Sequence, residues 1–334
     1  MKAIVEHVWS SDFDTLIKRL KEEKPTHLIW LGVTEYNFPE NWSKDLHILE
    51  QVLYENNIKI EFITGCDIND DYVYNRLVAP KVNMSIHPFP MYWVYETVRY
   101  LEIETTNIIP DIPPRTYINL NRNPHKFRCM MMDKLAERGL LSYGYNTWMR
   151  PGFYKDVWNF QHWEEKQLLL ENEDRVPANP TTDMNNDLTT VFSPPPEYFA
   201  AGINLAAEST SDIMFYTEKT MKNFFFKKPF IILGAQNINT NLKYYGFEIF
   251  EELIDYSFDN CSRLEDRIEG IADNIERLSK FPIYEIDQVL KKKLNHNYNR
   301  LMEIYYSKKF IPPVVEYYAK LGLGELDQKL QLSN

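Results

Sequence analysis

Glu218 and Lys219 are the residues whose types and spacing most directly suggest chemistry. They occupy the first turn of a helix predicted to begin at Thr217, where free backbone N–H groups favour an anion. A lysine at this end is mildly unfavourable for the helix itself, because it opposes the helix dipole. A bound phosphate would explain the lysine, and the carboxylate could accept two hydrogen bonds from a ribose. The alternative is a solvated Glu–Lys pair on an ordinary strand–helix–strand unit.

Two apolar runs typical of buried parallel strands flank this pair, Ile203–Ala207 and Phe230–Leu233. The helix between them is predicted to carry Lys227 and Lys228 in its last turn, where cations suit the dipole. In an open parallel sheet, ligands bind at the loop after the carboxyl end of a strand. We therefore expect the loop after the first run to line a ligand site. One face of the helix carries three apolar side chains, namely Met221, Phe224 and Phe225.

The same stretch resembles the donor motif of the α1,3/4-fucosyltransferases. The resemblance is carried by Glu208-Ser209, by the run FYTEK at Phe215–Lys219, and by PFIILG at Pro229–Gly234. The family reads F-E-N-S, a short gap, D-Y-I-T-E-K, and then an apolar strand that ends in Gly. In that family the second Glu holds the nucleotide ribose and the Lys holds the diphosphate. The resemblance gives these roles to Glu218 and Lys219.

Two arginines follow another predicted strand, at residues 117–120. Arg122 lies in the loop after it, and Arg128 lies in the helix predicted at residues 126–138. In the fucosyltransferases an arginine on the first helix of the donor domain contacts the diphosphate, and Arg128 is its closest counterpart here. Arginines that only solvate the helix face are the alternative. Together, the predicted donor-binding residues are Arg122, Arg128, Glu208, Ser209, Tyr216, Thr217, Glu218 and Lys219.

Composition limits the classes of partner. The net charge of −11 argues against non-specific binding to nucleic acid or anionic lipid, because both depend on neutralising phosphate. Only 11 Gly are present and no G-x-G-x-x-G or Walker pattern occurs, so phosphate recognition would rest on side chains and a helix end. Cys66, Cys129 and Cys261 are widely spaced, which predicts core thiols in a reducing compartment. Without a signal peptide or a run of membrane-spanning length, we expect a cytoplasmic protein.

Length and element order predict two α/β domains and a helical end. A proline-rich linker at residues 108–114 separates the domains. We assign residues 1–112 to an acceptor-side Rossmann-like domain, 113–282 to a donor-binding Rossmann-like domain, and 283–334 to C-terminal helices. The resemblance implies that the two doubly wound domains form a GT-B-like architecture. Other predicted helices are at residues 12–23, 45–54, 91–100, 158–170, 239–245, 262–280, 286–306 and 314–330, and other predicted strands at 27–33, 58–64, 82–86 and 246–250.

The catalytic base is expected in the first domain. Glu35 ends the run WLGVTE, which resembles the fucosyltransferase run W-M-N-F-E that carries the family's base, and Asp67 after the next strand is its rival. Either residue is otherwise an ordinary loop carboxylate. We predict no metal site, because Asp67 with the acidic residues that follow it fits a turn with helix-capping residues. His87 and His125 also lie at predicted strand ends, where we interpret each as structural.

These observations favour a metal-independent glycosyltransferase that needs no cofactor. Its donor would be a nucleoside-diphosphate sugar such as GDP-fucose, and its acceptor a hydroxyl group, with a glycan favoured. The wider pattern, through Gly246-Phe247 and Ile254-Asp255, is also similar to glycosyltransferase-like proteins of phages and large DNA viruses. Two alternatives remain open: a catalytically inert protein that binds a nucleotide or glycan, and a viral DNA-base glycosyltransferase, which the acidic charge disfavours.

Overall fold

The computed structural model describes residues 3–7, 13–32, 43–67, 82–88, 114–121, 125–147, 194, 196–280 and 287–307. These residues fall into two compact units, which divide at residues 96 and 304. Each unit contains a parallel β-sheet with helices packed against it, so the predicted mixed α/β class is confirmed.

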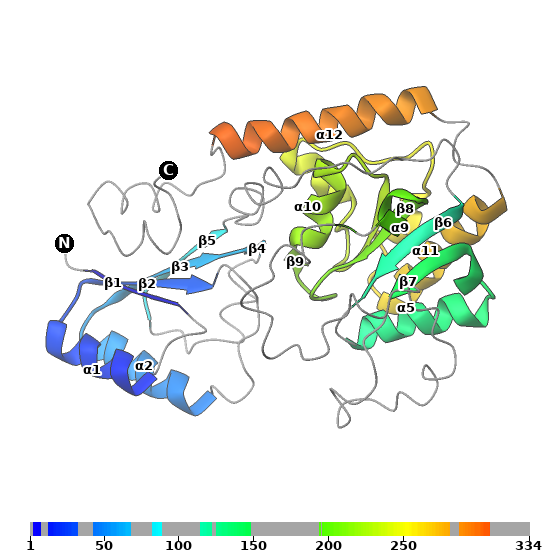
Figure 1. The fold of residues 1–334 in the computed structure, drawn as a ribbon. Coiled ribbons are helices and arrows are strands. Elements are labelled where there is room, and N and C mark those ends of the chain that lie inside the picture. Colours follow the sequence, from blue (N-terminus) through cyan, green and yellow to red (C-terminus); the bar gives the residue numbers. More distant parts are fainter. Residues whose placement is uncertain are drawn as a thin grey trace. The chain divides into compact units, whose positions relative to one another are not determined.

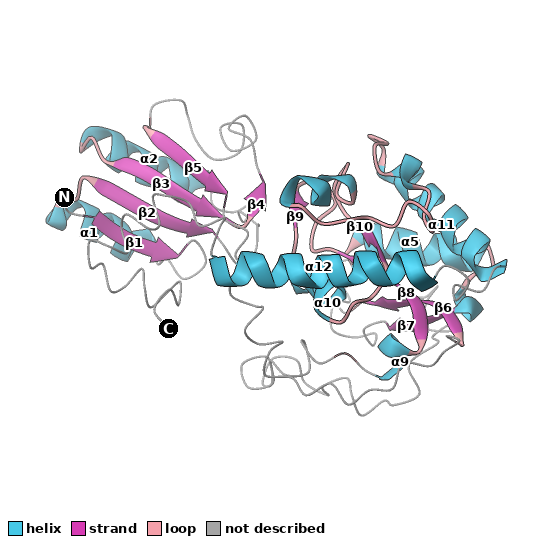
Figure 2. Cartoon of the chain, turned by 90° about the horizontal axis from the view of Figure 1, so that it is seen from above, coloured by secondary structure: helices cyan, strands magenta, loops and turns pink. Residues whose placement is uncertain are grey.

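The sheet of the first unit has the order β1-β2-β3-β5, and all its strands are parallel. Because successive right-handed crossovers run in one direction here, helices α1 and α2 lie on the same face and pack on each other (Figures 1 and 2). Buried apolar side chains on the strands and helices form the core. The elements are β1 (Ala3–His7), α1 (Phe13–Glu23), β2 (His27–Gly32), α2 (Ser43–Glu55), β3 (Lys59–Thr64), β4 (Cys66–Asp67) and β5 (Met84–Pro88).

The sheet of the second unit is also parallel, but its order is β10-β8-β6-β7. The chain first moves from β6 to β7 on one side and then crosses to β8 on the other, so the direction of winding reverses between β6 and β8. The seven residues of β8 are all buried, as their apolar composition predicts. The strands of this sheet are β6 (Arg115–Leu120), β7 (Gly144–Thr147), β8 (Ala201–Ala207) and β10 (Phe230–Leu233), and the short strand β9 (Met214–Phe215) lies outside it.

Helices cover both faces of this second sheet. Right-handed crossovers in opposite directions place α5 and α10 on opposite faces, and α11 packs against α5. The reversal and the two helical layers are features of doubly wound sheets. The helices are α5 (Lys126–Glu137), α9 (Pro196–Phe199), α10 (Glu218–Phe225), α11 (Leu264–Lys280) and α12 (Asp287–Ser307), with 3-10 turns η3 (Leu141–Tyr143), η5 (Thr240–Tyr245) and η6 (Tyr256–Phe258).

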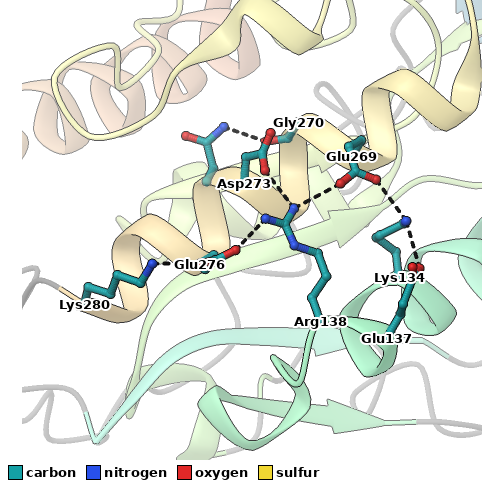
Figure 3. A network of polar contacts seen from close by, with 9 residues as sticks. Lys134, Glu137, Arg138, Glu269, Gly270, Asp273, Glu276 and Lys280 are labelled. Atoms are coloured by element: carbon teal, nitrogen blue, oxygen red, sulfur yellow. Dashed lines mark hydrogen bonds and ion pairs between the residues drawn. The ribbon is translucent and has the colours of Figure 1, made fainter.

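An ion-pair network joins α5 to α11 (Figure 3). Arg138, directly after α5, donates to Asp273 over 2.7 Å and also bonds Glu276 and Glu269 of α11. Lys134 lies 2.9 Å from the other carboxylate oxygen of Glu269. Single exposed ion pairs contribute little, but a guanidinium shared by three carboxylates loses less side-chain entropy per contact. The network therefore fixes α11 over the helix that leads away from β6.

Residues 246–250 do not form a strand, contrary to the prediction. Phe247 and Phe250 are buried, as a strand pattern requires, but no neighbouring strand pairs with this segment among the described residues. Instead, the Glu248 N–H donates to Asn297 Oδ1 over 2.7 Å, and Asn297 Nδ2 donates to the Glu248 carbonyl over 2.8 Å. A side-chain amide of α12 thus replaces the backbone of a neighbouring strand, which a strand-like apolar pattern does not reveal.

The end of α10 also differs from the prediction. The helix stops at Phe225, so Lys227 and Lys228 lie beyond it, and Lys222 occupies its last turn. Lys227 is exposed and adopts a left-handed backbone with a φ of 51°. Lys228 is 7% exposed, and its ammonium group donates to the carbonyl of Ala201. Burial lowers the pKa of Lys228 to about 7.

Two of the cysteines are less buried than predicted. Cys129 and Cys261 form no disulfide, and both are partly exposed rather than in the core. Burial and nearby Asp133 raise the pKa of Cys129 to about 11, so it remains a thiol. Among the helices described, none is long and apolar enough to cross a membrane. The predicted helices at 91–100, 158–170 and 314–330, and the linker except for Pro114, lie outside the described residues.

Candidate functional site

The candidate site lies in the second unit, at the carboxyl ends of β6 and β8. Because the strand order reverses between these two strands, the loops that follow them lead to helices on opposite faces. Ligands of open parallel sheets bind at such a reversal. The loop after β6 leads to His125 and α5, and the loop after β8 leads to Thr217 and α10.

Glu208, the residue after β8, holds its loop from inside the protein. It is fully buried, and its Oε1 accepts hydrogen bonds from the Thr217 N–H, over 3.1 Å, and from the Thr220 hydroxyl. Its Oε2 accepts from the Thr217 hydroxyl. Burial raises the pKa of Glu208, and the charge of Lys219 and the two threonine hydroxyls offset this in part. Glu208 therefore positions the start of α10 and does not reach the surface of the site.

Lys219 lies over the amino end of α10. Its Nζ is 3.0 Å from a Glu218 carboxylate oxygen, 3.2 Å from Thr217 Oγ1 and 3.4 Å from Ser209 Oγ. Thr217 is the N-cap and accepts a hydrogen bond from the Lys219 N–H. These oxygens compensate for a cation at the positive end of the dipole. Because the Lys219 side chain is 24% exposed, its ammonium group can also meet an anion from solvent.

Charge is concentrated on the first two turns of α10. Burial opposes the ionisation of Glu218, but Lys219 and Lys222 outweigh it and keep the pKa of Glu218 below its ordinary value. Lys222 is 8% exposed, and its burial lowers its pKa to about 8. A carboxylate between two amines thus remains charged at neutral pH. The arrangement combines an acceptor for hydroxyl groups with a partner for an anion.

Arg128 connects the two loops. The residue is 3% exposed, and its guanidinium donates to the carbonyls of Ala207, over 3.2 Å, and Glu208, over 2.6 Å. His125 precedes the same helix, and burial together with the charges of Arg128 and Lys219 lowers its pKa to about 4. The imidazole is therefore neutral at physiological pH. Arg128 thus joins α5 to the end of β8. Its charge is buried behind the site, and its N–H groups bond backbone carbonyls.

The loop after β8 has two further anchors, and one of them is Tyr216, which was predicted to bind the donor. Tyr216 is 6% exposed and donates from its hydroxyl to the Ile238 carbonyl over 2.7 Å, so it holds the loop instead of lining the site. Arg267 of α11 donates to the Ser211 carbonyl over 3.2 Å. A distant helix residue such as Arg267 carries no local signal. The positions of Thr220 and Lys222 near the site could have been predicted from the sequence, because both follow Thr217 on the predicted helix.

The structure brings together six of the predicted residues: Arg128, Glu208, Ser209, Thr217, Glu218 and Lys219. Arg122 and Glu35 lie outside the described residues, and of Asp67 only the backbone, in β4, is described. Within the described segments, no group of three or more His, Cys, Asp or Glu side chains could hold a metal ion.

Comparison of the chain with models of protein families, with curated proteins and with solved structures finds no match. The site and the fold therefore carry the functional argument alone.

Proposed function

We propose that the protein is a glycosyltransferase that uses a nucleoside-diphosphate sugar and transfers the sugar to a hydroxyl acceptor without a metal. In this proposal the two parallel-sheet units correspond to the two Rossmann-like domains of a GT-B-like enzyme. The second unit would bind the donor and the first the acceptor.

One observation carries the proposal. At the reversal of a parallel sheet, the amino end of α10 presents a carboxylate and a partly exposed ammonium group side by side, Glu218 and Lys219. The ammonium group, at the positive end of the helix dipole, suits a diphosphate, and the carboxylate suits the two hydroxyls of a ribose. A nucleoside diphosphate carries both features a short distance apart.

The chemistry follows from this arrangement. As the acceptor oxygen bonds to the anomeric carbon, the bond from that carbon to the diphosphate breaks, and the diphosphate leaves with the electron pair. Lys219 stabilises the negative charge that develops on it, an effect that is strongest in a site from which water is partly excluded. Glu208 and Arg128 hold the loops rigid, so that Lys219 needs little rearrangement during the reaction.

Calorimetric titration of GDP and GDP-fucose, followed by other nucleotide sugars, tests the proposal. Lys219→Ala should weaken nucleotide binding by about 10- to 100-fold, which is about 1.4 to 2.8 kcal/mol. Glu218→Ala should weaken it less. Lys243→Ala is the matched control, because Lys243 is an exposed lysine of the same unit that pairs with Glu251 at the surface. Equal affinity in the wild type and both site variants would refute the assignment of the site.

Release of nucleotide from the donor separates an enzyme from an inert binding protein. A transferase hydrolyses its donor slowly in water, whereas a binding protein leaves the donor intact. Binding without release would therefore support the inert alternative. Salt-sensitive binding to duplex DNA would instead favour a DNA-base acceptor.

A further inference from the structure

The first unit contains a buried carboxylate in its central sheet, Glu61. Glu61 is 5% exposed and lies in β3 between apolar neighbours, Ile60 and Phe62. Side chains of a strand alternate between faces. Because Glu6 pairs with Arg19 of α1 and lies in register with Trp30 and Phe62, Glu61 lies on the opposite face of the sheet from α1.

Glu61 binds one histidine from the neighbouring strand. Ile63 of β3 is in register with His87 of β5, so the imidazole of His87 reaches back to Glu61 along the same face. His87 Nε2 lies 2.7 Å from Glu61 Oε2, and Lys59 Nζ lies 2.8 Å from Glu61 Oε1. The His87 side chain is 24% exposed, against 6% for Glu61. A buried acid thus holds a histidine that solvent can reach.

The charges around Glu61 keep it ionised. Burial opposes ionisation, but the hydrogen bonds from Lys59 and His87 outweigh it and lower the pKa of Glu61. His27 of β2 is in register with Lys59. Burial lowers the pKa of His27, and the charge of Glu61 opposes this in part. Because a carboxylate accepts hydrogen bonds, Nε2 of His87 carries a hydrogen, which leaves the lone pair of the neutral imidazole on Nδ1.

The contacts of Glu61 are weak evidence for a purely structural role. Replacing a buried ion pair by packed apolar groups is often neutral or stabilising, so such pairs are weak evidence for stability. A buried acid that orients a partly exposed histidine is instead the arrangement used in acid–base catalysis. His87 also lies one residue from the end of β5, at the carboxyl edge of a parallel sheet, where functional groups gather.

We propose that His87, oriented by Glu61, is the general base that deprotonates the acceptor hydroxyl. This inference rests on the function proposed above, in which the first unit binds the acceptor. Nδ1 of His87 takes the proton as the acceptor oxygen bonds to the anomeric carbon, while the diphosphate leaves with the electrons of the broken bond. The carboxylate of Glu61 stabilises the imidazolium that forms. His87 is the catalytic residue, and Glu61 is a positioning residue.

Nucleotide release from GDP-fucose and the other donors, with water as acceptor, tests this inference. His87→Ala should lower the release rate by about 10²- to 10⁴-fold and leave GDP affinity unchanged. Added imidazole should restore part of the rate, which a purely structural role for His87 would not allow. Glu61→Gln should lower the rate and shift its pH dependence. Ser85→Ala, in register with Glu61 on β5, is the matched control and should change neither quantity.

The possible results separate the role of His87 from the proposed function. A His87→Ala protein that releases nucleotide at the wild-type rate, or one that binds GDP but gains nothing from imidazole, overturns the inference and leaves the proposed function standing. A wild-type protein that releases nucleotide from no donor refutes the proposed function. Should the alanine variant fail to fold, ¹⁵N NMR of the wild type replaces it: a hydrogen on Nδ1 of His87 overturns the inference, and one on Nε2 supports it.

Discussion

Glu208→Ala removes the acceptor of three buried hydrogen bonds, from the Thr217 N–H, the Thr217 hydroxyl and the Thr220 hydroxyl. Each buried donor left without a partner costs about 1 to 3 kcal/mol, and the cavity adds to this. Because the donors can partly relax, we expect a loss of about 4 kcal/mol in the free energy of unfolding.

Glu208→Gln is the informative comparison. The amide keeps an oxygen for the Thr217 N–H and the Thr220 hydroxyl, and it avoids a buried charge, so we expect a cost below about 1 kcal/mol. Because burial raises the pKa of Glu208, the folded wild type binds more protons than the unfolded chain just above pH 4.5. Its stability should therefore fall as the pH rises through that window, and the glutamine variant should lack this dependence.

Hydrogen–deuterium exchange of peptides covering residues 208–220, together with urea unfolding followed by circular dichroism, measures both effects. Exchange isolates the local contribution, since a chain with two units need not unfold in a single transition. Faster exchange in Glu208→Ala than in Glu208→Gln is the expected order. If the two variants are equally impaired, the negative charge and not the acceptor geometry holds the loop, and the reasoning is refuted.

Three further outcomes are expected from denaturant unfolding. Lys228→Met should stabilise the protein by about 3 kcal/mol at pH 6 and by less at pH 9. The pKa of Lys228 in the folded protein is about 7, so above pH 7 the folded state binds fewer protons than the unfolded state. The stability of the wild type therefore rises with pH, and the advantage of the methionine variant shrinks. Asn297→Ala should cost about 2 to 4 kcal/mol. Asn297→Asp should cost no less, because a carboxylate oxygen of this buried side chain would face the Glu248 carbonyl where the amide now donates. An Asp variant as stable as the wild type would contradict the paired geometry. Gly270→Ala should destabilise by about 1 to 3 kcal/mol despite better helix propensity, because a Cβ there would lie 2.4 Å from Phe258 Cβ, and a stabilised variant would contradict this.

Local patterns predicted the core of the candidate site. The apolar runs gave β8 and β10, and Thr217 marked the start of α10, because strand burial and N-capping are written in a few consecutive residues. The order of the strands was not accessible in this way. It depends on which strands pair across long stretches of chain, and it decides that the ends of β6 and β8 meet.

Contacts between residues that lie far apart in the sequence were not predicted. Glu208 was predicted to bind the donor, but its carboxylate points inward and accepts hydrogen bonds from two threonines. His87 was interpreted as a lone structural histidine, and that interpretation stays untested. Its contact with Glu61, 26 positions earlier, depends on the register of β3 and β5. The side-chain amide of Asn297 bonds the backbone of Glu248, 49 positions earlier, as a neighbouring strand would. In each case the partner is chosen by tertiary packing.

The contacts of Arg128 have a consequence for how the protein matures. Its guanidinium bonds carbonyls 79 and 80 positions further along the chain, so the site is complete only after β6 and β8 have paired. Contacts of such long sequence separation form slowly, because the intervening chain must first lose much of its freedom. A ligand that binds at this site therefore binds only after the second unit has folded. A chain truncated before residue 208 should not bind it.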